Sequence, residues 1–240
     1  TEFPDNPAID FLGHKLTYSE LDALVSRAAC GLQKLGVGPG VHVGLYLPNC
    51  PHYFIGFLGV LRAGGTVVNY SPLDAERTLE HKIEDSQTDI MLTLDLEAFY
   101  PRMASLMTRT RLRQLVVGSL VEFCGEVSDE QRHLLGKPAM VAWGDQCCSF
   151  AELLDNAGDY REHLLADPAN TLAVLQYTGG TTGVPKGAML THGNITASCA
   201  QLREVLRSAI VPGQERVLAV LPPFHIYALM VNMIFGLRAA

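Results

Sequence analysis

One short segment of the sequence carries the residue types that bind phosphate groups. Four glycines, three threonines and a lysine occur together, namely Thr178, Gly179, Gly180, Thr181, Thr182, Gly183, Lys186 and Gly187. Glycines let backbone N–H groups approach an anion without a Cβ in the way, while threonine hydroxyls and a lysine ammonium add donors and charge. We therefore predict that this glycine/threonine segment (residues 178–187) is a phosphate-binding loop.

The segment differs from the Walker type of phosphate loop, in which Ser or Thr follows the lysine at the start of a helix. Here Pro185 precedes Lys186 and Gly187 follows it. The apolar run at 172–175 predicts a buried strand before the segment. A flexible surface loop between a strand and a helix is the alternative, but hydroxyls and a cation grouped directly after a buried strand favour phosphate binding. Residues 179–183 are expected to be mobile without a ligand.

A second candidate for chemistry lies downstream, in the segment Pro-Pro-Phe-His-Ile-Tyr at residues 222–227. We refer to it as the aromatic–histidine segment. His225 stands between the aromatic residues Phe224 and Tyr227, just after a predicted strand. Residue type alone favours a histidine that is hydrogen-bonded within the core over a functional one.

The residues from Tyr177 to Gly187 resemble the signature loop of the AMP-forming acyl-adenylate synthetases. This superfamily includes acyl-CoA synthetases, luciferases and the adenylation domains of peptide synthetases. The resemblance implies that the loop closes over the β- and γ-phosphates of ATP while a carboxylate is adenylated. By the same resemblance, a set of loop residues holds the pyrophosphate leaving group with Mg²⁺. These are Thr178, Gly179, Gly180, Thr181, Thr182, Gly183 and Lys186, with Thr182 as the metal ligand and Lys186 as a catalytic residue.

The aromatic–histidine segment resembles a Phe-His pair that borders the acyl pocket in fatty-acid and aryl-acid CoA ligases. The resemblance implies that Phe224, His225 and Tyr227 bind the substrate and that His225 acts near the reacting carboxylate. Amino-acid-activating relatives carry an aspartate at this point, and its absence disfavours an amino acid substrate.

The implied reaction has two steps: a carboxylate attacks MgATP to give acyl-AMP and pyrophosphate, and the thiol of coenzyme A then displaces AMP. The similarity of residues 221–227 to fatty acyl-CoA ligases, together with His225, favours a medium- or long-chain fatty acid. The uncharged side chains between Phe224 and Phe235 could line an alkyl tunnel. Core packing explains them equally well. Aryl acids such as coumarate remain an alternative substrate class.

Composition narrows the class of protein. The 240 residues are 48% hydrophobic and 18% charged, which predicts a globular fold. A net charge of −7 without a run of Lys or Arg argues against nucleic acid binding and favours small-molecule partners. No H-E-x-x-H pattern supports a zinc site. The six cysteines lack disulfide or metal-ligand spacing, so we expect free thiols and a cytoplasmic protein.

Neither end of the chain nor its most apolar stretch predicts a membrane span. The N-terminus lacks the apolar core of a signal peptide. The uncharged stretch at 217–237 is divided by Pro222 and Pro223 into a predicted strand and a predicted helix, each too short to cross a bilayer alone. We expect no transmembrane segment, while a peripheral contact with a membrane stays open.

Strands and helices alternate along the first half of the chain. A capping box at Thr17 to Glu20 begins a predicted amphipathic helix that ends at Gly36. Predicted strands at 41–47, 66–70, 89–94 and 112–117 then alternate with predicted helices at 52–63, 71–86 and 96–107. This order predicts an α/β fold of layered, largely parallel sheets flanked by helices. The resemblance makes it the N-terminal part of the acyl-adenylate synthetase fold.

The pattern loosens between 118 and 167, and we predict a subdomain boundary near Asp167. Residues 1–167 would form an N-terminal α/β subdomain, and residues 168–240 the start of a second α/β subdomain that carries the glycine/threonine segment. In this second part we expect a helix from Thr191 to about 209, a strand at 216–221 and an apolar helix after residue 227.

The sequence contains nothing that resembles the superfamily's Tyr-Gly-x-Thr-Glu segment, its Thr-Gly-Asp segment or the lysine of its mobile lid domain. We therefore expect the N-terminal part of a fatty acid–CoA ligase that is inactive by itself. The alternative is a non-catalytic module that binds nucleotides, acyl groups or protein partners.

Overall fold

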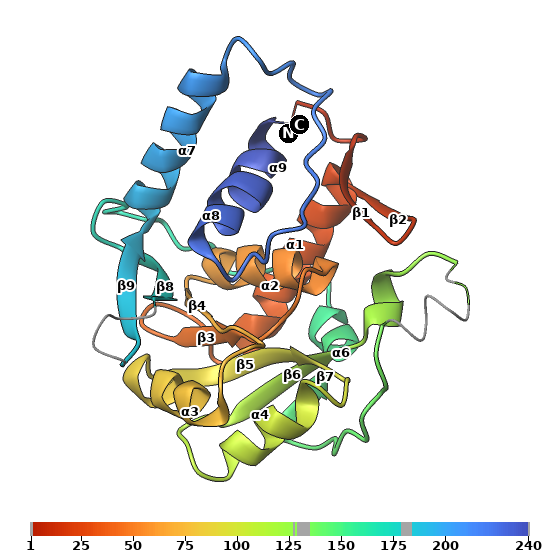
Figure 1. The fold of residues 1–240 in the computed structure, drawn as a ribbon, viewed down its shortest axis with the longest axis vertical. Coiled ribbons are helices and arrows are strands. Elements are labelled where there is room, and N and C mark those ends of the chain that lie inside the picture. The colour runs from red at the N-terminus through yellow and green to blue at the C-terminus, as the bar shows by residue number, and fades with distance from the viewer. Residues whose placement is uncertain (1, 127, 129–134, 179–183, 240) are drawn as a thin grey trace.

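A seven-stranded sheet forms the centre of the computed structural model, which describes residues 2–126, 128, 135–178 and 184–239 (Figure 1). The strand order is β7-β6-β5-β3-β4-β8-β9. All neighbouring strands are parallel except β8 and β9, which are antiparallel. The strands are β3 (His42–Leu45), β4 (Thr66–Asn69), β5 (Thr88–Leu94), β6 (Gln114–Gly118), β7 (Cys147–Ser149), β8 (Leu172–Thr178) and β9 (Lys186–Thr191). The predicted α/β fold with a largely parallel sheet is confirmed.

Helices cover both faces of this sheet. Helices α1 (Tyr18–Lys34) and α2 (Pro51–Arg62) lie on one face, and α3 (Glu76–Asp85) and α4 (Tyr100–Met107) lie on the other (Figure 1). The chain moves from β3 to β4 in one direction and from β4 to β5 in the opposite one. Because crossovers between parallel strands are right-handed, this reversal puts α2 and α3 on opposite faces.

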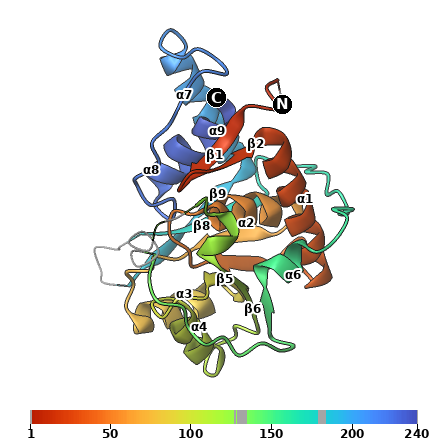
Figure 2. The same ribbon diagram turned by 90° about the vertical axis from the view of Figure 1, so that its right-hand side faces the viewer.

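Two capping boxes fix the starts of helices, and the one at Thr17 is as predicted. The Thr17 hydroxyl accepts a hydrogen bond from the Glu20 N–H at 3.2 Å, and the Glu20 carboxylate accepts one from the Thr17 N–H at 2.8 Å. Ser149 and Glu152 form the same arrangement at α6 (Phe150–Leu154), which lies beside α1 (Figure 2). A short antiparallel hairpin of β1 (Pro7–Phe11) and β2 (His14–Thr17) precedes α1.

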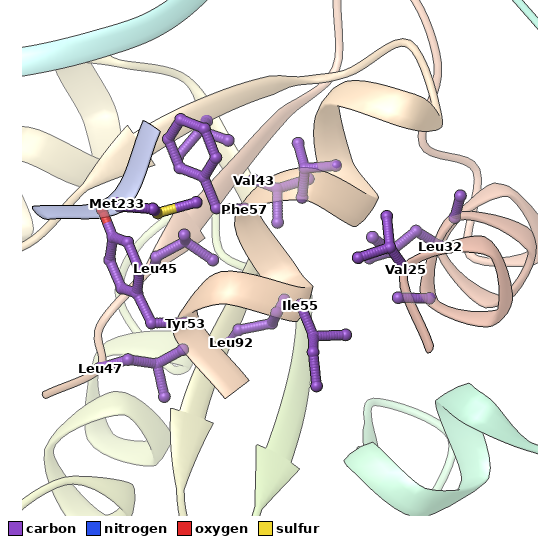
Figure 3. Close-up of a cluster of buried hydrophobic side chains, with 14 of the residues drawn as sticks. Val25, Leu32, Val43, Leu45, Leu47, Tyr53, Ile55, Phe57, Leu92 and Met233 are labelled. Carbon is purple, nitrogen blue, oxygen red and sulfur yellow. The ribbon is translucent and has the colours of Figure 1, made fainter. Parts of the chain in front are cut away.

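The main hydrophobic core fills the space between the sheet and the α1/α2 layer (Figure 3). Val43 and Leu45 from β3 pack there with Ile55 and Phe57 from α2, and all four are completely buried. Met233, from the end of the chain, reaches the same cluster. The C-terminal helical segment therefore belongs to the core of this sheet.

That C-terminal segment is helical without interruption from Ile226 to Ala239. It consists of the short helix α8 (Ile226–Ala228), the π-helix η2 (Leu229–Phe235) and the short helix α9 (Gly236–Ala239). Leu229, Met230, Met233 and Phe235 are all buried, so they pack in the core. The predicted apolar helix is confirmed. Among the described residues, no helix is both long enough and apolar enough to span a membrane.

Several predicted boundaries shift and one predicted strand is wrong. Helix α3 begins at Glu76 because Ser71 to Asp74 form a turn, closed by a hydrogen bond from the Asp74 N–H to the Ser71 carbonyl. Helix α4 begins at Tyr100, and α7 (His192–Leu206) ends three residues early. A short 3₁₀ helix, η1 (Leu120–Phe123), follows β6.

The predicted strand at 216–221 has no regular secondary structure. Leu218 is 81% exposed and Val220 is 69% exposed, so the alternating apolar residues are not buried on a sheet. The side-chain amide of Asn49 donates hydrogen bonds to the carbonyls of Ala219 and Leu221, at 2.7 and 3.0 Å. These carbonyls bind a side chain, and no strand among the described residues pairs with the segment.

Strands β8 and β9 join the same sheet as the strands before residue 118. The proposed subdomain boundary near Asp167 stays a prediction.

Cys147 and Cys148 are free thiols, as expected for the cysteines of this chain.

Candidate functional site

The glycine/threonine segment begins at the edge of the sheet where ligands are expected. Thr178 ends β8, and β8 lies beside β4 in the parallel part of the sheet. The carboxyl ends of β3, β4 and β8 therefore meet at one edge. In open α/β sheets, ligands bind outside this edge near the point where the strand order reverses. Here the order reverses at β3.

The structure places the segment between two antiparallel strands. Thr178 pairs with Lys186, and Tyr177 pairs with Gly187. The expected order of strand, loop and helix is therefore wrong, because β9 comes before the helix. The choice between a phosphate-binding loop and a flexible surface loop stays a prediction. Helix α7 follows, and Thr191 caps it by accepting a hydrogen bond from the Asn194 N–H at 3.1 Å, as predicted. Thr178 and Lys186 are both exposed at the base of this hairpin.

The remaining residues of the predicted loop, Gly179, Gly180, Thr181, Thr182 and Gly183, lie outside the described residues. Their roles, the assignment of Thr182 as a metal ligand and the expected mobility of 179–183 stay predictions. No group of three or more His, Cys, Asp or Glu side chains in the described part of the chain could hold a metal ion. Mg²⁺ commonly binds through substrate phosphates and few protein ligands, so it would enter here as part of MgATP.

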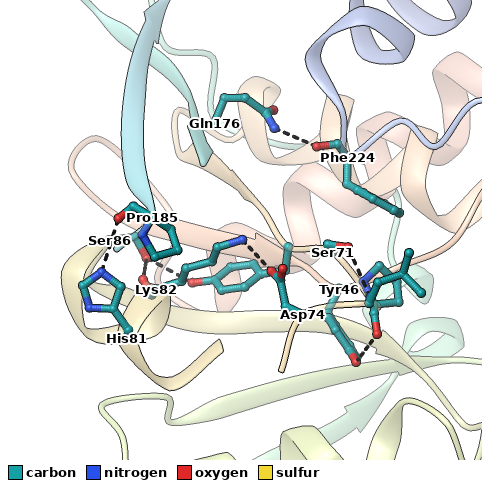
Figure 4. A network of polar contacts seen from close by, with 12 residues as sticks. Tyr46, Ser71, Asp74, His81, Lys82, Ser86, Gln176, Pro185 and Phe224 are labelled. Carbon is teal, nitrogen blue, oxygen red and sulfur yellow. Dashed lines mark hydrogen bonds and ion pairs between the residues drawn. The ribbon is translucent and has the colours of Figure 1, made fainter. Parts of the chain in front are cut away.

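A buried chain of hydrogen bonds connects the two candidate segments. The Gln176 amide donates to the Phe224 carbonyl at 2.7 Å (Figure 4). Its oxygen accepts from the Asn69 amide at 2.9 Å. The Tyr53 hydroxyl lies 2.7 Å from Asn69 Oδ1 and 2.9 Å from the Pro223 carbonyl, and it donates to this pair of acceptors. The aromatic–histidine segment is thus attached to β8, two residues before Thr178.

The three predicted substrate residues differ in exposure. Phe224 is buried, and its ring centroid lies 4.8 Å from that of His225. His225 begins α8 and its side chain is exposed, so it is not a core histidine. Tyr227 is also exposed, at 64%. The hydrogen bond from Gln176 to the neighbouring Phe224 carbonyl brings His225 to the same edge as β8.

Sequence reasoning missed a second polar cluster beside the hairpin. Lys82 of α3 pairs with Asp74, and its ammonium lies 5.3 Å from the centroid of the Tyr177 ring (Figure 4). Lys82 shares the buried face of α3 with Leu79 and Ile83. Their spacing of three and four residues is the signal that could have placed Lys82 toward the sheet.

Arg102 of α4 fixes the loop that carries Asp74. Its guanidinium donates to the Tyr46 hydroxyl at 3.0 Å and to the carbonyls of Pro72 and Asp74 at 3.3 Å each. The Arg102 guanidinium therefore fixes the loop after β4 from the side of α4. Sequence reasoning offered no signal for this contact, because Arg102 and Asp74 belong to different elements.

Burial keeps the tyrosines of this edge neutral. Desolvation raises the pKa of Tyr53 and of Tyr177 above the ordinary value, and the hydrogen bond to Asp85 raises that of Tyr177 further. Desolvation also raises the pKa of Tyr46, against the effect of Arg102. All three phenols therefore act as hydrogen-bonding groups at neutral pH and not as anions.

A cleft of about 660 Å³ lies elsewhere, between α1, α7 and α9. Apolar side chains of Val25, Ile195 and Phe235 line it, and Arg203 and Arg238 stand at its border. None of the predicted site residues lines this cleft. It is therefore separate from the edge that carries the two candidate segments.

Comparison with known proteins decides the family. A family model described as AMP-binding enzyme matches residues 1–240. The chain belongs to this family. The chain is 35% identical, over 240 residues, to a long-chain-fatty-acid–CoA ligase of Bacillus subtilis. That match covers 98% of the chain and 42% of the relative. The chain is also 30% identical, over 231 residues, to 4-coumarate–CoA ligase 5 of Oryza sativa. This second match covers 95% of the chain and 37% of the relative.

A solved structure shares the fold of this chain. It is a long-chain-fatty-acid-CoA ligase from Archaeoglobus fulgidus, with a TM-score of 0.76 and 25% sequence identity. The match covers 98% of this chain and 43% of the solved one. The resemblance to acyl-adenylate synthetases is confirmed, and the chain spans about two fifths of the length of these relatives.

Proposed function

We propose that the full-length protein that contains this chain is a fatty acid–CoA ligase. It converts a fatty acid, ATP and coenzyme A into acyl-CoA, AMP and pyrophosphate through an acyl-AMP intermediate. The observation that carries the proposal is the hydrogen bond from Gln176 to the Phe224 carbonyl. It connects the strand that leads into the glycine/threonine segment, which we propose to bind phosphate, with the aromatic–histidine segment, which we propose to bind the carboxylate. Both lie at one edge of the sheet.

In the first step, a carboxylate oxygen attacks the α-phosphorus of MgATP. A bond forms between this oxygen and the α-phosphorus, and the bond from the α-phosphorus to the bridging oxygen of the β-phosphate breaks. The exposed groups of Thr178 and Lys186 suit the pyrophosphate that leaves, since a hydroxyl and an ammonium can donate to its oxygens. Positioning and charge neutralisation dominate such transfers, so no side chain needs to act as a nucleophile.

In the second step, the thiol of coenzyme A attacks the acyl carbonyl carbon and AMP leaves with the electron pair of the broken carbon–oxygen bond. We propose that His225 lies next to the reacting carboxylate. Phe224 and Tyr227 would line the acyl pocket. The exposed imidazole of His225 beside the buried ring of Phe224 supports this assignment, since it offers one polar and one apolar contact.

The substrate class gives a direct test. Relatives named for long-chain fatty acids and for 4-coumarate both match the chain, and the fatty acid is favoured by the higher identity of the former. We expect higher kcat/KM for CoA thioester formation with fatty acids than with cinnamic acids at matched concentration. A preference for cinnamates above about tenfold, or about 1.4 kcal/mol in transition-state binding, would reject the fatty acid and support an aryl acid.

The isolated 240-residue chain is expected to be inactive. Its two candidate segments offer groups for the phosphates and the carboxylate, and the sequence has nothing like the superfamily's adenine and ribose segments. Carboxylate-dependent ATP–pyrophosphate exchange by the purified chain, above a buffer blank, would contradict this prediction. Tight binding of ATP or acyl groups by a naturally short, inactive form would instead support the non-catalytic module.

A cytoplasmic location and contact with a membrane surface stay predictions.

A further inference from the structure

A buried cation lies beside the glycine/threonine segment and has no role in the proposed mechanism. The Lys82 side chain is only 7% exposed, and its ammonium lies 2.5 Å from the Asp74 carboxylate. A buried ammonium is unfavourable unless it is paired, and a pair of hydrophobic residues often gives similar stability. The fold alone therefore does not require a lysine at this position.

Lys82 contacts Tyr177 of β8, the strand that leads into the glycine/threonine segment. Its ammonium lies 5.3 Å from the centroid of the Tyr177 ring, within the range of a cation–π interaction. The Tyr177 hydroxyl donates to the Asp85 carboxylate at 2.5 Å. Helix α3 therefore holds the Tyr177 side chain at two points, the ring through Lys82 and the hydroxyl through Asp85.

The Tyr177 ring in turn lies against the backbone of β9. A Cβ added at Gly187 would lie 3.3 Å from Cζ of this ring, closer than most such contacts, so the glycine leaves room for the tyrosine. Gly187 is also the residue paired with Tyr177 in the strand ladder. On the other side of Lys186, the Pro185 carbonyl lies 3.4 Å from Nε2 of His81, also on α3 (Figure 4). Helix α3 thus contacts Pro185 directly through His81, and it reaches Gly187 indirectly through Tyr177.

We propose that Lys82, acting through Tyr177, is a positioning residue that fixes the β9 backbone at Lys186 so that the Lys186 ammonium meets the pyrophosphate portion of MgATP. The inference rests on the proposed function for its kinetic test. A binding measurement examines it independently of catalysis, because pyrophosphate affinity depends on the position of Lys186 whether or not a carboxylate is activated.

The test compares variants of the full-length protein. Lys82→Met removes the cation but leaves Asp74 without a partner, so the double change of Lys82→Met with Asp74→Asn is made as well. Lys82→Arg keeps the charge over the ring. Ile83→Val is the matched control, because Ile83 is fully buried on the same face of α3 and the change affects packing only. Thermal unfolding establishes that each variant is folded.

We expect both Lys82→Met variants to weaken binding of magnesium pyrophosphate about tenfold and to lower kcat/KM for MgATP in pyrophosphate exchange by a similar factor. The KM for the fatty acid should stay within about twofold of wild type, since Lys82 does not touch the aromatic–histidine segment. Lys82→Arg should recover most of the affinity, and Ile83→Val should change neither constant.

Three results would overturn the inference and leave the proposed function standing: wild-type pyrophosphate affinity in the double variant, an equal loss in Ile83→Val, or a uniform loss of activity that raises the KM of both substrates. A wild-type protein that binds magnesium pyrophosphate without catalysing exchange would reject the proposed function alone. In that case the loss or retention of affinity in the Lys82 variants still decides the inference. Absence of binding by the folded wild type would overturn both.

Discussion

Replacing Lys186 with alanine in the full-length protein should lower kcat/KM for adenylation by about 100- to 1,000-fold, the usual effect of removing one donor to a developing negative charge. Lys186 is the cation of the glycine/threonine segment and its side chain is exposed at the base of the β8–β9 hairpin. The loss should appear in pyrophosphate exchange with MgATP, since the lysine is assigned to the leaving group. The free energy of unfolding should change little, because the side chain has no buried partner in the described part of the chain.

Two companion variants make this prediction specific. Lys186→Arg should keep part of the activity, because the charge remains while its geometry changes. Lys15→Ala removes an exposed lysine on β2 that faces Asp10 at 4.0 Å, far from the candidate site, and should leave the exchange rate unchanged. A Lys186→Ala protein with exchange within about threefold of wild type would remove Lys186 from the mechanism.

Replacing Gln176 with leucine should disconnect the two halves of the candidate site. Gln176 donates to the Phe224 carbonyl and accepts from the Asn69 amide, and it is buried. Leucine leaves both partners without a hydrogen bond, at a cost of about 1–3 kcal/mol for each buried group. We expect the free energy of unfolding to fall by about 2–6 kcal/mol and the KM for the fatty acid to rise more than that for MgATP.

Gln33 offers a matched control for this change. Its amide donates to the Arg161 carbonyl at 2.8 Å and its oxygen accepts from the Arg161 N–H at 2.8 Å, on helix α1 away from the site. Gln33→Leu should reduce stability without a selective effect on the fatty acid. If Gln176→Leu and Gln33→Leu proteins show the same kinetic constants, the connection between β8 and Phe224 has no part in substrate binding.

The helices were predictable where local signals are strong. The capping boxes at Thr17 and Ser149 fix a helix start within four residues of sequence, and both helices form there. Strand β9 carries no such signal, because it follows a glycine-rich segment and becomes a strand only by pairing with β8. The predicted strand at 216–221 fails for the opposite reason, since it has the alternating pattern but no partner among the described strands.

The candidate site was predictable in its residue types and not in its connections. Thr178, Lys186 and His225 stand out because hydroxyl, ammonium and imidazole groups occur in recognisable segments. Asn69 and Gln176 are 107 residues apart in the sequence, and their hydrogen bond exists only because β4 and β8 are neighbours in the sheet. Lys82 and its partner Asp74 are only eight residues apart, but they meet because Lys82 lies on the buried face of α3 and Asp74 lies in the loop before this helix.

The most direct test of the proposed function is ATP–pyrophosphate exchange by the folded full-length protein, measured with labelled pyrophosphate in the absence of coenzyme A. Formation of acyl-AMP is reversible and needs no thiol, so exchange separates adenylation from thioester formation. We expect exchange that requires both MgATP and a fatty acid and that is lost in the Lys186→Ala variant. Exchange that is absent, or that proceeds equally without a carboxylate, would contradict it.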